Sequence, residues 1–260
     1  MYLPQLLTRV EKGEKLSVLT CYDASFARLL AENGVDVLLV GDSLGMTIQG
    51  HASTLPVTME DMIYHTKAVA RGAADKAFVV ADLPFGSYQK NPEQAFDAAA
   101  RLMAAGANMV KLEGGAIMLD SVRFLCQRGI PVCAHLGLLP QSVNVTGYRT
   151  QARDAAAAAQ LLQDAGDMET AGAQMLVMES IPSLLAQQVT QQARMPTIGI
   201  GAGLHCNGQV LVLQDLLGLT PKPPRFAKDF MHGTDSLAAA IRAYVAAVKT
   251  GDFPGPEHSF

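Results

Sequence analysis

The 260-residue sequence contains no tryptophan, and aromatic residues amount to only 6% of it. Its core must therefore be built mainly from Ala, Leu, Val, Ile and Met, which suits the layered side-chain packing inside an α/β barrel. Apolar stretches of about 20 residues, which a membrane-spanning helix needs, are also missing. The first residues lack the charged region and apolar run of a secretory signal peptide. We therefore expect no association with a membrane.

Positive charge and paired cysteines are scarce as well. The chain has 20 Lys and Arg against 24 Asp and Glu, a net charge of −4. This balance argues against nucleic acid or an anionic membrane as a partner, because both require a basic surface. The four cysteines, Cys21, Cys126, Cys133 and Cys206, show neither a CxxC motif nor a zinc-like spacing with histidine. Buried free thiols in a reducing compartment explain them best, so we expect a cytoplasmic protein.

Hydrophobic residues, by contrast, make up 49% of the chain and fall into a regular alternation. Short β-branched runs alternate with longer Ala- and Leu-rich stretches of helical period. Each helix would be a crossover between two strands, so the strands are predicted to be parallel. A doubly wound sheet gives the same alternation, but eight evenly spaced strand candidates favour a (β/α)8 TIM barrel, an α/β fold. We predict one catalytic barrel domain over residues 1–260, with strands at 17–20, 35–40, 78–81, 109–112, 132–134, 174–178, 197–200 and 209–213.

Polar residues recur at the C-terminal ends of these predicted strands. Taken singly, each has a simpler interpretation as a turn residue, a helix cap, a surface ion pair or a core histidine. In a barrel, however, these ends converge on the face that carries the active site. Charged residues gathered there would repel one another or lose solvation without a shared purpose. We therefore interpret seven residues as one site: Asp42, Ser43, Asp82, Lys111, Glu113, His135 and Glu179.

The residue types at this site indicate metal-assisted chemistry on a 2-oxo acid. Asp42, Asp82 and Glu113 offer hard oxygen ligands, which suit Mg²⁺ or Mn²⁺. Such an ion can bind a carboxylate and a keto oxygen and stabilise an enolate formed beside the carbonyl. Lys111 would meet the anionic end of the substrate. Glu179 follows an apolar strand, where desolvation favours a basic carboxylate, and is the predicted base; His135 could serve instead or hold a substrate oxygen.

Longer blocks of the sequence resemble the ketopantoate hydroxymethyltransferase family. They cover nearly the whole chain in order, at residues 41–46, 50–58, 81–85, 110–115, 135–138, 140–144, 199–203 and 257–260. The resemblance implies a barrel of the phosphoenolpyruvate/pyruvate type. It also implies transfer of a one-carbon unit from 5,10-methylenetetrahydrofolate to 3-methyl-2-oxobutanoate, giving 2-dehydropantoate on the way to pantothenate and coenzyme A. Members of the family form large homo-oligomers, often decamers.

The resemblance also assigns roles to residues. Asp42, Asp82 and Glu113 match the magnesium-site acids of the family, and Glu179 matches the proton acceptor. Together with the argument from placement, the candidate substrate contacts are Asp42, Ser43, Asp82, Lys111 and His135. Two segments depart from the family pattern: residues 146–150, where a glycine-richer run is usual, and residues 204–208, where an acidic residue commonly precedes Gly208.

Two other functions compete with this interpretation. Another metal-dependent enzyme of the same barrel type, such as an isocitrate-lyase-like C–C lyase, would be expected to carry a catalytic cysteine in a loop. Cys21 and Cys133 are predicted to lie in strands and Cys126 in a helix, which leaves Cys206 as the only loop thiol. A non-catalytic barrel subunit would be expected to have lost one or more of the site acids, and none is missing.

Overall fold

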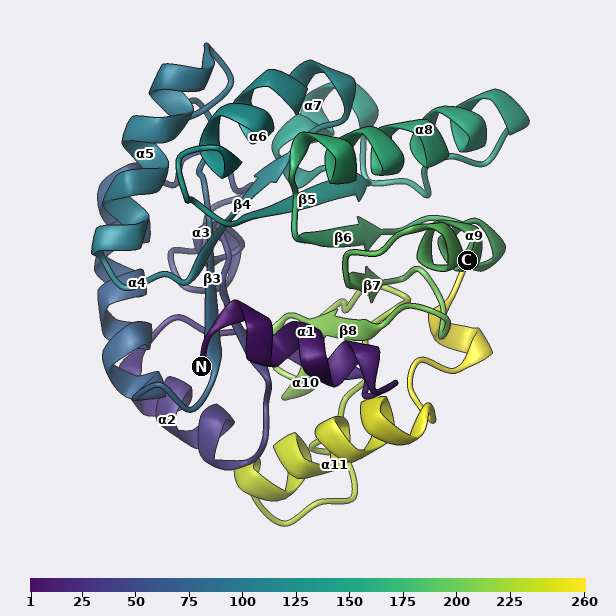
Figure 1. The fold of residues 1–260 in the computed structure, drawn as a ribbon. Coiled ribbons are helices and arrows are strands. Elements are labelled where there is room, and N and C mark those ends of the chain that lie inside the picture. Colours follow the sequence, from purple (N-terminus) through teal and green to yellow (C-terminus); the bar gives the residue numbers. More distant parts are fainter.

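Eight parallel strands close into a barrel in the computed structural model, which describes all 260 residues. The strands follow one another around the barrel in chain order, and the last pairs with the first. Figure 1 shows the helices arranged as a ring outside the strands. The predicted (β/α)8 architecture is confirmed, with strands β1 (Leu16–Thr20), β2 (Val37–Val40), β3 (Phe78–Asp82), β4 (Met109–Glu113), β5 (Val132–Gly137), β6 (Met175–Glu179), β7 (Thr197–Ile200) and β8 (Gly208–Leu211).

The helices begin where the sequence supplies an N-terminal cap. Thr58, the N-terminal cap of α4, accepts a hydrogen bond from the Asp61 N–H, and Asp61 Oδ2 accepts one from the Thr58 N–H. This reciprocal pair satisfies N–H groups that have no partner within the helix. The helices longer than four residues are α1 (Leu3–Glu11), α2 (Ala24–Glu32), α4 (Met59–Ala73), α5 (Pro92–Ala104), α6 (Leu119–Cys126), α8 (Ala155–Ala171), α9 (Ser183–Gln192) and α11 (Leu237–Thr250).

The two-residue period of the strands divides the apolar residues into two layers. In β3, Phe78 and Val80 belong to a cluster inside the barrel, whereas Val79 and Ala81 pack in a larger cluster between strands and helices. Successive side chains of a strand point to opposite faces. Asp82, the last residue of β3, therefore continues the inward row. The same rule directs Lys111 and Glu113 of β4, His135 of β5 and Glu179 of β6 into the barrel mouth.

The helix α1 closes the opposite end of the barrel, and the sequence analysis did not predict it. Leu6 is fully buried and belongs to the inner cluster with Leu16 and Phe78. Figure 1 shows this helix lying across the strands. A nine-residue amphipathic helix is marginal by itself, and the apolar barrel opening gives its buried face a place to pack. None of the helices combines the length and apolarity needed to cross a bilayer.

Several predicted boundaries were wrong in ways that concern the site. β5 runs on to Gly137, which pairs with Glu179 of β6, so His135 lies inside the strand rather than at its end. Cys21 lies just beyond β1 and not within it. It is therefore a second cysteine outside the strands and helices, beside Cys206. Both thiols are fully buried and neither lines the large cavity described below, so neither offers the loop nucleophile of the lyase alternative.

Candidate active site

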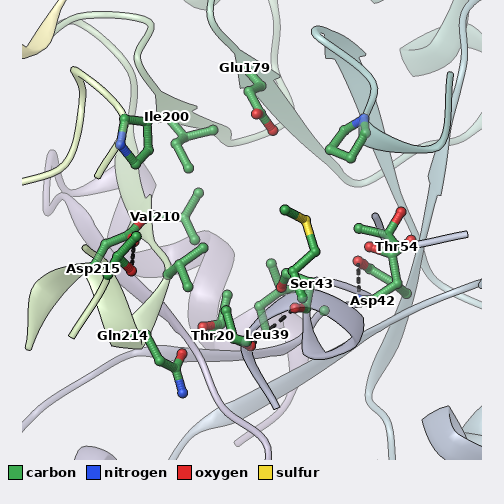
Figure 2. A pocket seen from close by; sticks show the side chains of 18 of the residues that line it. Thr20, Leu39, Asp42, Ser43, Thr54, Glu179, Ile200, Val210, Gln214 and Asp215 are labelled. Atoms are coloured by element: carbon green, nitrogen blue, oxygen red, sulfur yellow. Dashed lines mark hydrogen bonds between the residues drawn. The ribbon is translucent and has the colours of Figure 1, made fainter. Parts of the chain in front are cut away.

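A cavity of about 690 Å³ opens at the C-terminal end of the barrel. Figure 2 shows its walls, with Asp42, Ser43 and Glu179 among the side chains that face it. Ligand pockets commonly measure roughly 300–1,000 Å³. All seven site residues predicted from the sequence line this cavity: Asp42, Ser43, Asp82, Lys111, Glu113, His135 and Glu179.

Lys111 and Asp82 form a buried ion pair on neighbouring strands. They are register partners in β3 and β4, and Lys111 Nζ lies 3.1 Å from Asp82 Oδ1 with both side chains 4% exposed. Burial alone lowers the pKa of Lys111, but the charges of Asp82, Glu113 and Asp42 outweigh burial and raise that pKa. The side chain therefore stays an ammonium ion at neutral pH. It can bind an anionic substrate oxygen but cannot act as a base.

Asp42 lies beside this pair at the start of the loop after β2. Its backbone N–H donates to Asp82 Oδ2 at 3.1 Å. Burial, followed by the charges of Asp82 and Glu113, raises the pKa of Asp42 to about 8. Burial likewise raises the pKa of Asp82. Three buried carboxylates thus face one ammonium, and this excess of negative charge favours a bound cation.

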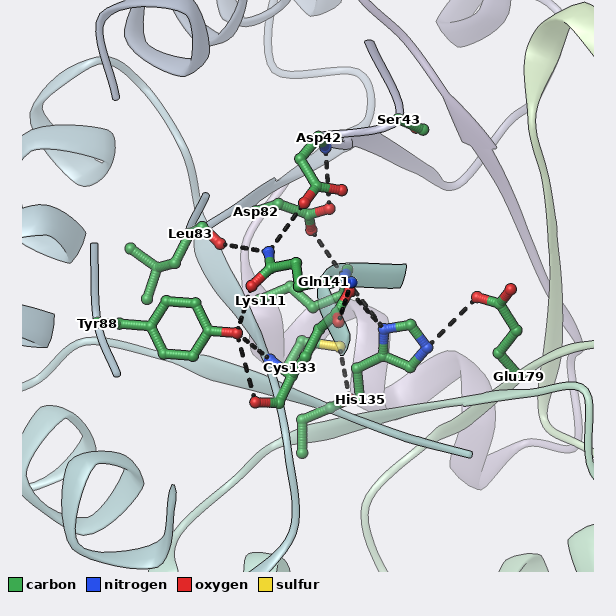
Figure 3. A network of polar contacts seen from close by, with 12 residues as sticks. Asp42, Ser43, Asp82, Leu83, Tyr88, Lys111, Cys133, His135, Gln141 and Glu179 are labelled. Atoms are coloured by element: carbon green, nitrogen blue, oxygen red, sulfur yellow. Dashed lines mark hydrogen bonds and ion pairs between the residues drawn. The ribbon is translucent and has the colours of Figure 1, made fainter. Parts of the chain in front are cut away.

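His135 lies between Glu113 and Glu179, and Figure 3 shows its contact with Glu179. Its Nδ1 lies 3.3 Å from Lys111 Nζ and 3.6 Å from Glu113 Oε1, and its Nε2 lies 3.4 Å from Glu179 Oε2. Burial and Lys111 lower the pKa of His135, but Glu113 and Glu179 outweigh them and raise it. Burial raises the pKa of Glu113, whereas His135 and Lys111 lower it, with a net decrease. His135 therefore lies between two acidic side chains, close enough to interact with both electrostatically.

Gln141, in the loop after β5, holds the acids in place. Its Nε2 donates to Asp42 Oδ2 at 2.8 Å and to the Leu83 carbonyl at 2.9 Å. Its Oε1 accepts from the Tyr88 hydroxyl at 2.7 Å, and its backbone N–H donates to Glu113 Oε2 at 3.0 Å. Gln141 therefore binds Asp42 through its side chain and Glu113 through its backbone, and these two acids lie at or just beyond the ends of different strands. Figure 3 shows the bond to Asp42.

Ser43 is held by a tyrosine on its other side. The Tyr22 hydroxyl and Ser43 Oγ lie 2.8 Å apart, and Tyr22 is buried. The chain approaches closely here, because a Cβ atom at Gly41 would lie only 2.7 Å from Ser43 Oγ. Glycine at this position lets the loop after β2 present Asp42 and Ser43 to the cavity.

The residues present fit a magnesium ion. Asp82 Oδ1 and Glu113 Oε1 are buried without a hydrogen-bond partner, since their contacts with Lys111 and His135 lack hydrogen-bond geometry. No three His, Cys, Asp or Glu side chains converge as a preformed metal cage. Mg²⁺, however, is usually held by one or two carboxylates together with waters and substrate oxygens. Asp42, Asp82 and Glu113 are the residues that would hold the ion, since Asp82 Oδ1 and Glu113 Oε1 have no hydrogen-bond partner.

Sequence reasoning missed the residues that support the site. Gln141 falls in residues 140–144, one of the blocks that resemble the family, but its partners could not be inferred from the sequence. Tyr22 and Tyr88 gave no signal, because a tyrosine near a strand end is more often a core residue. Asp215, after β8, was also missed, although it lines the same cavity.

Comparison with solved structures supports the fold alone. The chain matches a phosphoenolpyruvate phosphomutase from Streptomyces platensis with a TM-score of 0.64 and 14% identity, over 84% of this chain and 83% of that one. It matches a 2,3-dimethylmalate lyase, described as a member of the phosphoenolpyruvate mutase/isocitrate lyase superfamily, with a TM-score of 0.59 and 19% identity, over 80% of each chain. Both likenesses agree with the closed (β/α)8 barrel seen here.

Comparison with protein sequences is more specific. The 3-methyl-2-oxobutanoate hydroxymethyltransferase of Thiobacillus denitrificans is 65% identical over 251 residues, covering 96% of this chain and 95% of the relative. The enzyme of that name from Methylobacillus flagellatus is 62% identical over the full length of both chains. Residues 1–256 match the family model described as ketopantoate hydroxymethyltransferase. With the site acids, the lysine and the glutamate all in place around one cavity, the chain belongs to the ketopantoate hydroxymethyltransferase family.

Proposed function

We propose that this protein transfers a hydroxymethyl group from 5,10-methylenetetrahydrofolate to C3 of 3-methyl-2-oxobutanoate. The products are 2-dehydropantoate and tetrahydrofolate, and one water molecule is consumed. The observation that carries the proposal is the arrangement of the cavity. The Lys111 ammonium, the acids Asp42 and Asp82, and the carboxyl group of Glu179 all face this one space.

Binding of the oxo acid follows from the charges at the barrel mouth. The Lys111 ammonium is held by Asp82 and can pair with the substrate carboxylate or with the oxygen that becomes negative on enolisation. Ser43, held by Tyr22, can donate a hydrogen bond to a second oxygen. Asp42 and Asp82 would hold Mg²⁺, which acts as a Lewis acid on the keto group when bound.

Glu179 is the base that removes the C3 proton, because the other ionisable groups of the site are less available for this role. Lys111 is kept protonated, and both nitrogens of His135 already contact charged neighbours. The side chain of Glu179 is 15% exposed, against 3% for Glu113, and it faces the open cavity (Figure 2). A general base must come within hydrogen-bond reach of the proton that it removes. Glu179 can meet this condition for a substrate that bridges Lys111 and Asp42.

The carbon–carbon bond forms after proton removal. Glu179 takes the C3 proton, and the electron pair of the enolate attacks the methylene carbon carried by the folate. Both carbon–nitrogen bonds of that carbon break, and water supplies the hydroxyl group. One nitrogen of the folate takes the proton held by Glu179 and the other takes a proton from that water, so tetrahydrofolate leaves and Glu179 is again a carboxylate. His135 Nε2, 3.4 Å from Glu179 Oε2, is the nearest charged or polar neighbour of this carboxylate in the described ion pairs.

The test separates proton removal from carbon transfer. Proton NMR in D₂O follows exchange at C3 of 3-methyl-2-oxobutanoate, with and without Mg²⁺, and product formation is followed after 5,10-methylenetetrahydrofolate is added. We expect Mg²⁺-dependent exchange and then 2-dehydropantoate. Exchange without product on addition of the folate would refute the transferase assignment, and product formed equally well after chelation would refute the metal. Asp120→Asn, at an exposed acid on α6, is the matched control for loss of a carboxylate.

A further inference from the structure

One buried acid in the cavity is not used by the chemistry of the oxo acid. Asp215 lies in α10 (Leu213–Leu216), directly after β8, and only 6% of its surface is exposed. It lines the same cavity as the site acids. Figure 2 shows Asp215 on the opposite side of this cavity from Asp42. Its position points to a ligand other than the small oxo acid.

The carboxyl group of Asp215 has few partners within the protein. Thr220 Oγ1 donates to its Oδ1 at 2.5 Å, and no hydrogen bond reaches Oδ2. No ion pair of the protein includes Asp215. Burial raises its pKa, and the Thr220 hydrogen bond opposes this only in part. Asp215 lines the cavity and its Oδ2 is not fully enclosed by protein, so N–H donors from a ligand can reach this oxygen.

Apolar side chains line the space between Asp215 and the reacting groups, where the faces of a planar ring can pack. Leu39, Ile200 and Val210 form this part of the wall (Figure 2). A cavity of about 690 Å³ is far larger than the oxo acid requires. Pockets of such size accommodate ligands of roughly the dimensions of a drug molecule. A second, larger molecule can therefore occupy the Asp215 side while the oxo acid lies against Lys111.

We propose that Asp215 binds the pterin ring of the folate co-substrate through the edge that carries the 2-amino group and the N3–H. This inference rests on the proposed function. The two N–H groups lie side by side and match the two oxygens of a carboxylate. Each oxygen can accept more than one hydrogen bond, so the bond from Thr220 is kept. N5, which carries the one-carbon unit, is at the other end of the bicyclic ring and faces back toward Lys111 and Glu179.

The tail of the folate would then leave through the mouth of the cavity. Lys222 is exposed and lines this mouth. Its ammonium can pair with the carboxylates of the glutamate tail, in a solvated setting where such pairs are weak. The two ends of the molecule are thus bound by different residues, and this permits a test that distinguishes them.

The experiment compares two probes by calorimetry under reducing conditions. Tetrahydrofolate carries both the ring and the tail, whereas 6-methyltetrahydropterin carries the ring alone. We expect Asp215→Asn to weaken both probes by about ten- to a hundredfold, because a charge-assisted hydrogen bond is lost. Lys222→Ala should weaken tetrahydrofolate only. In steady-state assays Asp215→Asn should raise the KM for the folate while that for the oxo acid stays close to the value of the unmodified enzyme. Asp120→Asn is again the matched control.

The outcomes separate this inference from the proposed function. If Asp215→Asn binds both probes as tightly as the unmodified protein does, the inference is wrong, while the transferase assignment stands as long as 2-dehydropantoate is formed. If the unmodified protein neither binds tetrahydrofolate nor uses its methylene derivative, the proposed function fails. Should Asp215→Asn lose its circular dichroism signal, the unmodified protein is tested with 2-desamino-6-methyltetrahydropterin. Undiminished binding of that analogue would overturn the assignment of Asp215.

Discussion

Replacing Lys111 by methionine tests the charge balance on which the site depends. The substitution keeps most of the apolar stem and removes the ammonium that lies 3.1 Å from Asp82 Oδ1. Both side chains are 4% exposed, so water cannot replace the lost partner. Removing one partner of a buried ion pair costs about 3–5 kcal/mol, because the other charge stays buried. At roughly 2–4 °C per kcal/mol for a chain of this size, the thermal midpoint should fall by about 6–20 °C.

The effect depends on pH with a defined sign. Burial raises the pKa of Asp82 in the folded protein above its unfolded value, and loss of the lysine raises it further. Below the unfolded pKa, Asp82 is protonated in both states and adds no penalty. As the pH rises past that value, the unfolded state releases a proton that the folded state retains. The free energy of unfolding therefore falls as the pH rises. We therefore expect a larger deficit at about pH 8 than at about pH 5.

Circular dichroism melts at the two pH values measure this deficit. Lys76→Met is the matched control, since Lys76 lies 3.4 Å from Glu32 with both side chains at least half exposed. Such surface pairs contribute about 0–1 kcal/mol. Adding Asp82→Asn to Lys111→Met should recover much of the midpoint, because the uncompensated charge is gone. The reasoning is refuted if the Lys111 and Lys76 variants melt together, or if the deficit is the same at both pH values.

The other predictions concern the base, the metal and the loop amide. Glu179→Gln should slow C3 exchange by about 10²–10⁴-fold, while calorimetry shows nearly unchanged binding of the oxo acid. If Glu179→Gln exchanges the C3 proton at the normal rate and His135→Asn does not exchange it, the base is His135. Asp82→Ala should abolish measurable Mg²⁺ binding with the fold kept, and an unchanged affinity would remove Asp82 from the metal site. Mg²⁺ binds the ionised carboxylate of Asp42, whose pKa is about 8. Below pH 8, each increase of one pH unit should therefore raise Mg²⁺ affinity by up to about tenfold. A flat pH profile of Mg²⁺ affinity would contradict this. Gln141→Ala should lower both Mg²⁺ affinity and the thermal midpoint, because a buried hydrogen bond to a charged group contributes about 1.5–3 kcal/mol; wild-type values of both would show that the amide is dispensable.

The positions of the site acids along the chain were predictable because strand periodicity is a local property. Apolar residues with a period of two define which side of a strand is inside, and Lys111 and Glu113 fall on the same side as Met109. Parallel strands joined by helices place all their C-terminal ends on one face. The sequence alone therefore determined the fold class and the common face on which Asp82 and Glu179 lie.

The contacts between these residues were decided by the tertiary structure. Lys111 meets Asp82 because β3 and β4 pair in one particular register, and a shift of that register would separate them. Gln141 bonds to Asp42 across 99 residues of sequence, and closure of β8 onto β1 completes the ring in which Asp215 lies across from the acids. Periodicity fixes the direction of a side chain relative to its own strand. Register and barrel closure fix which side chains meet, and they follow from packing of the whole chain, which no local pattern encodes.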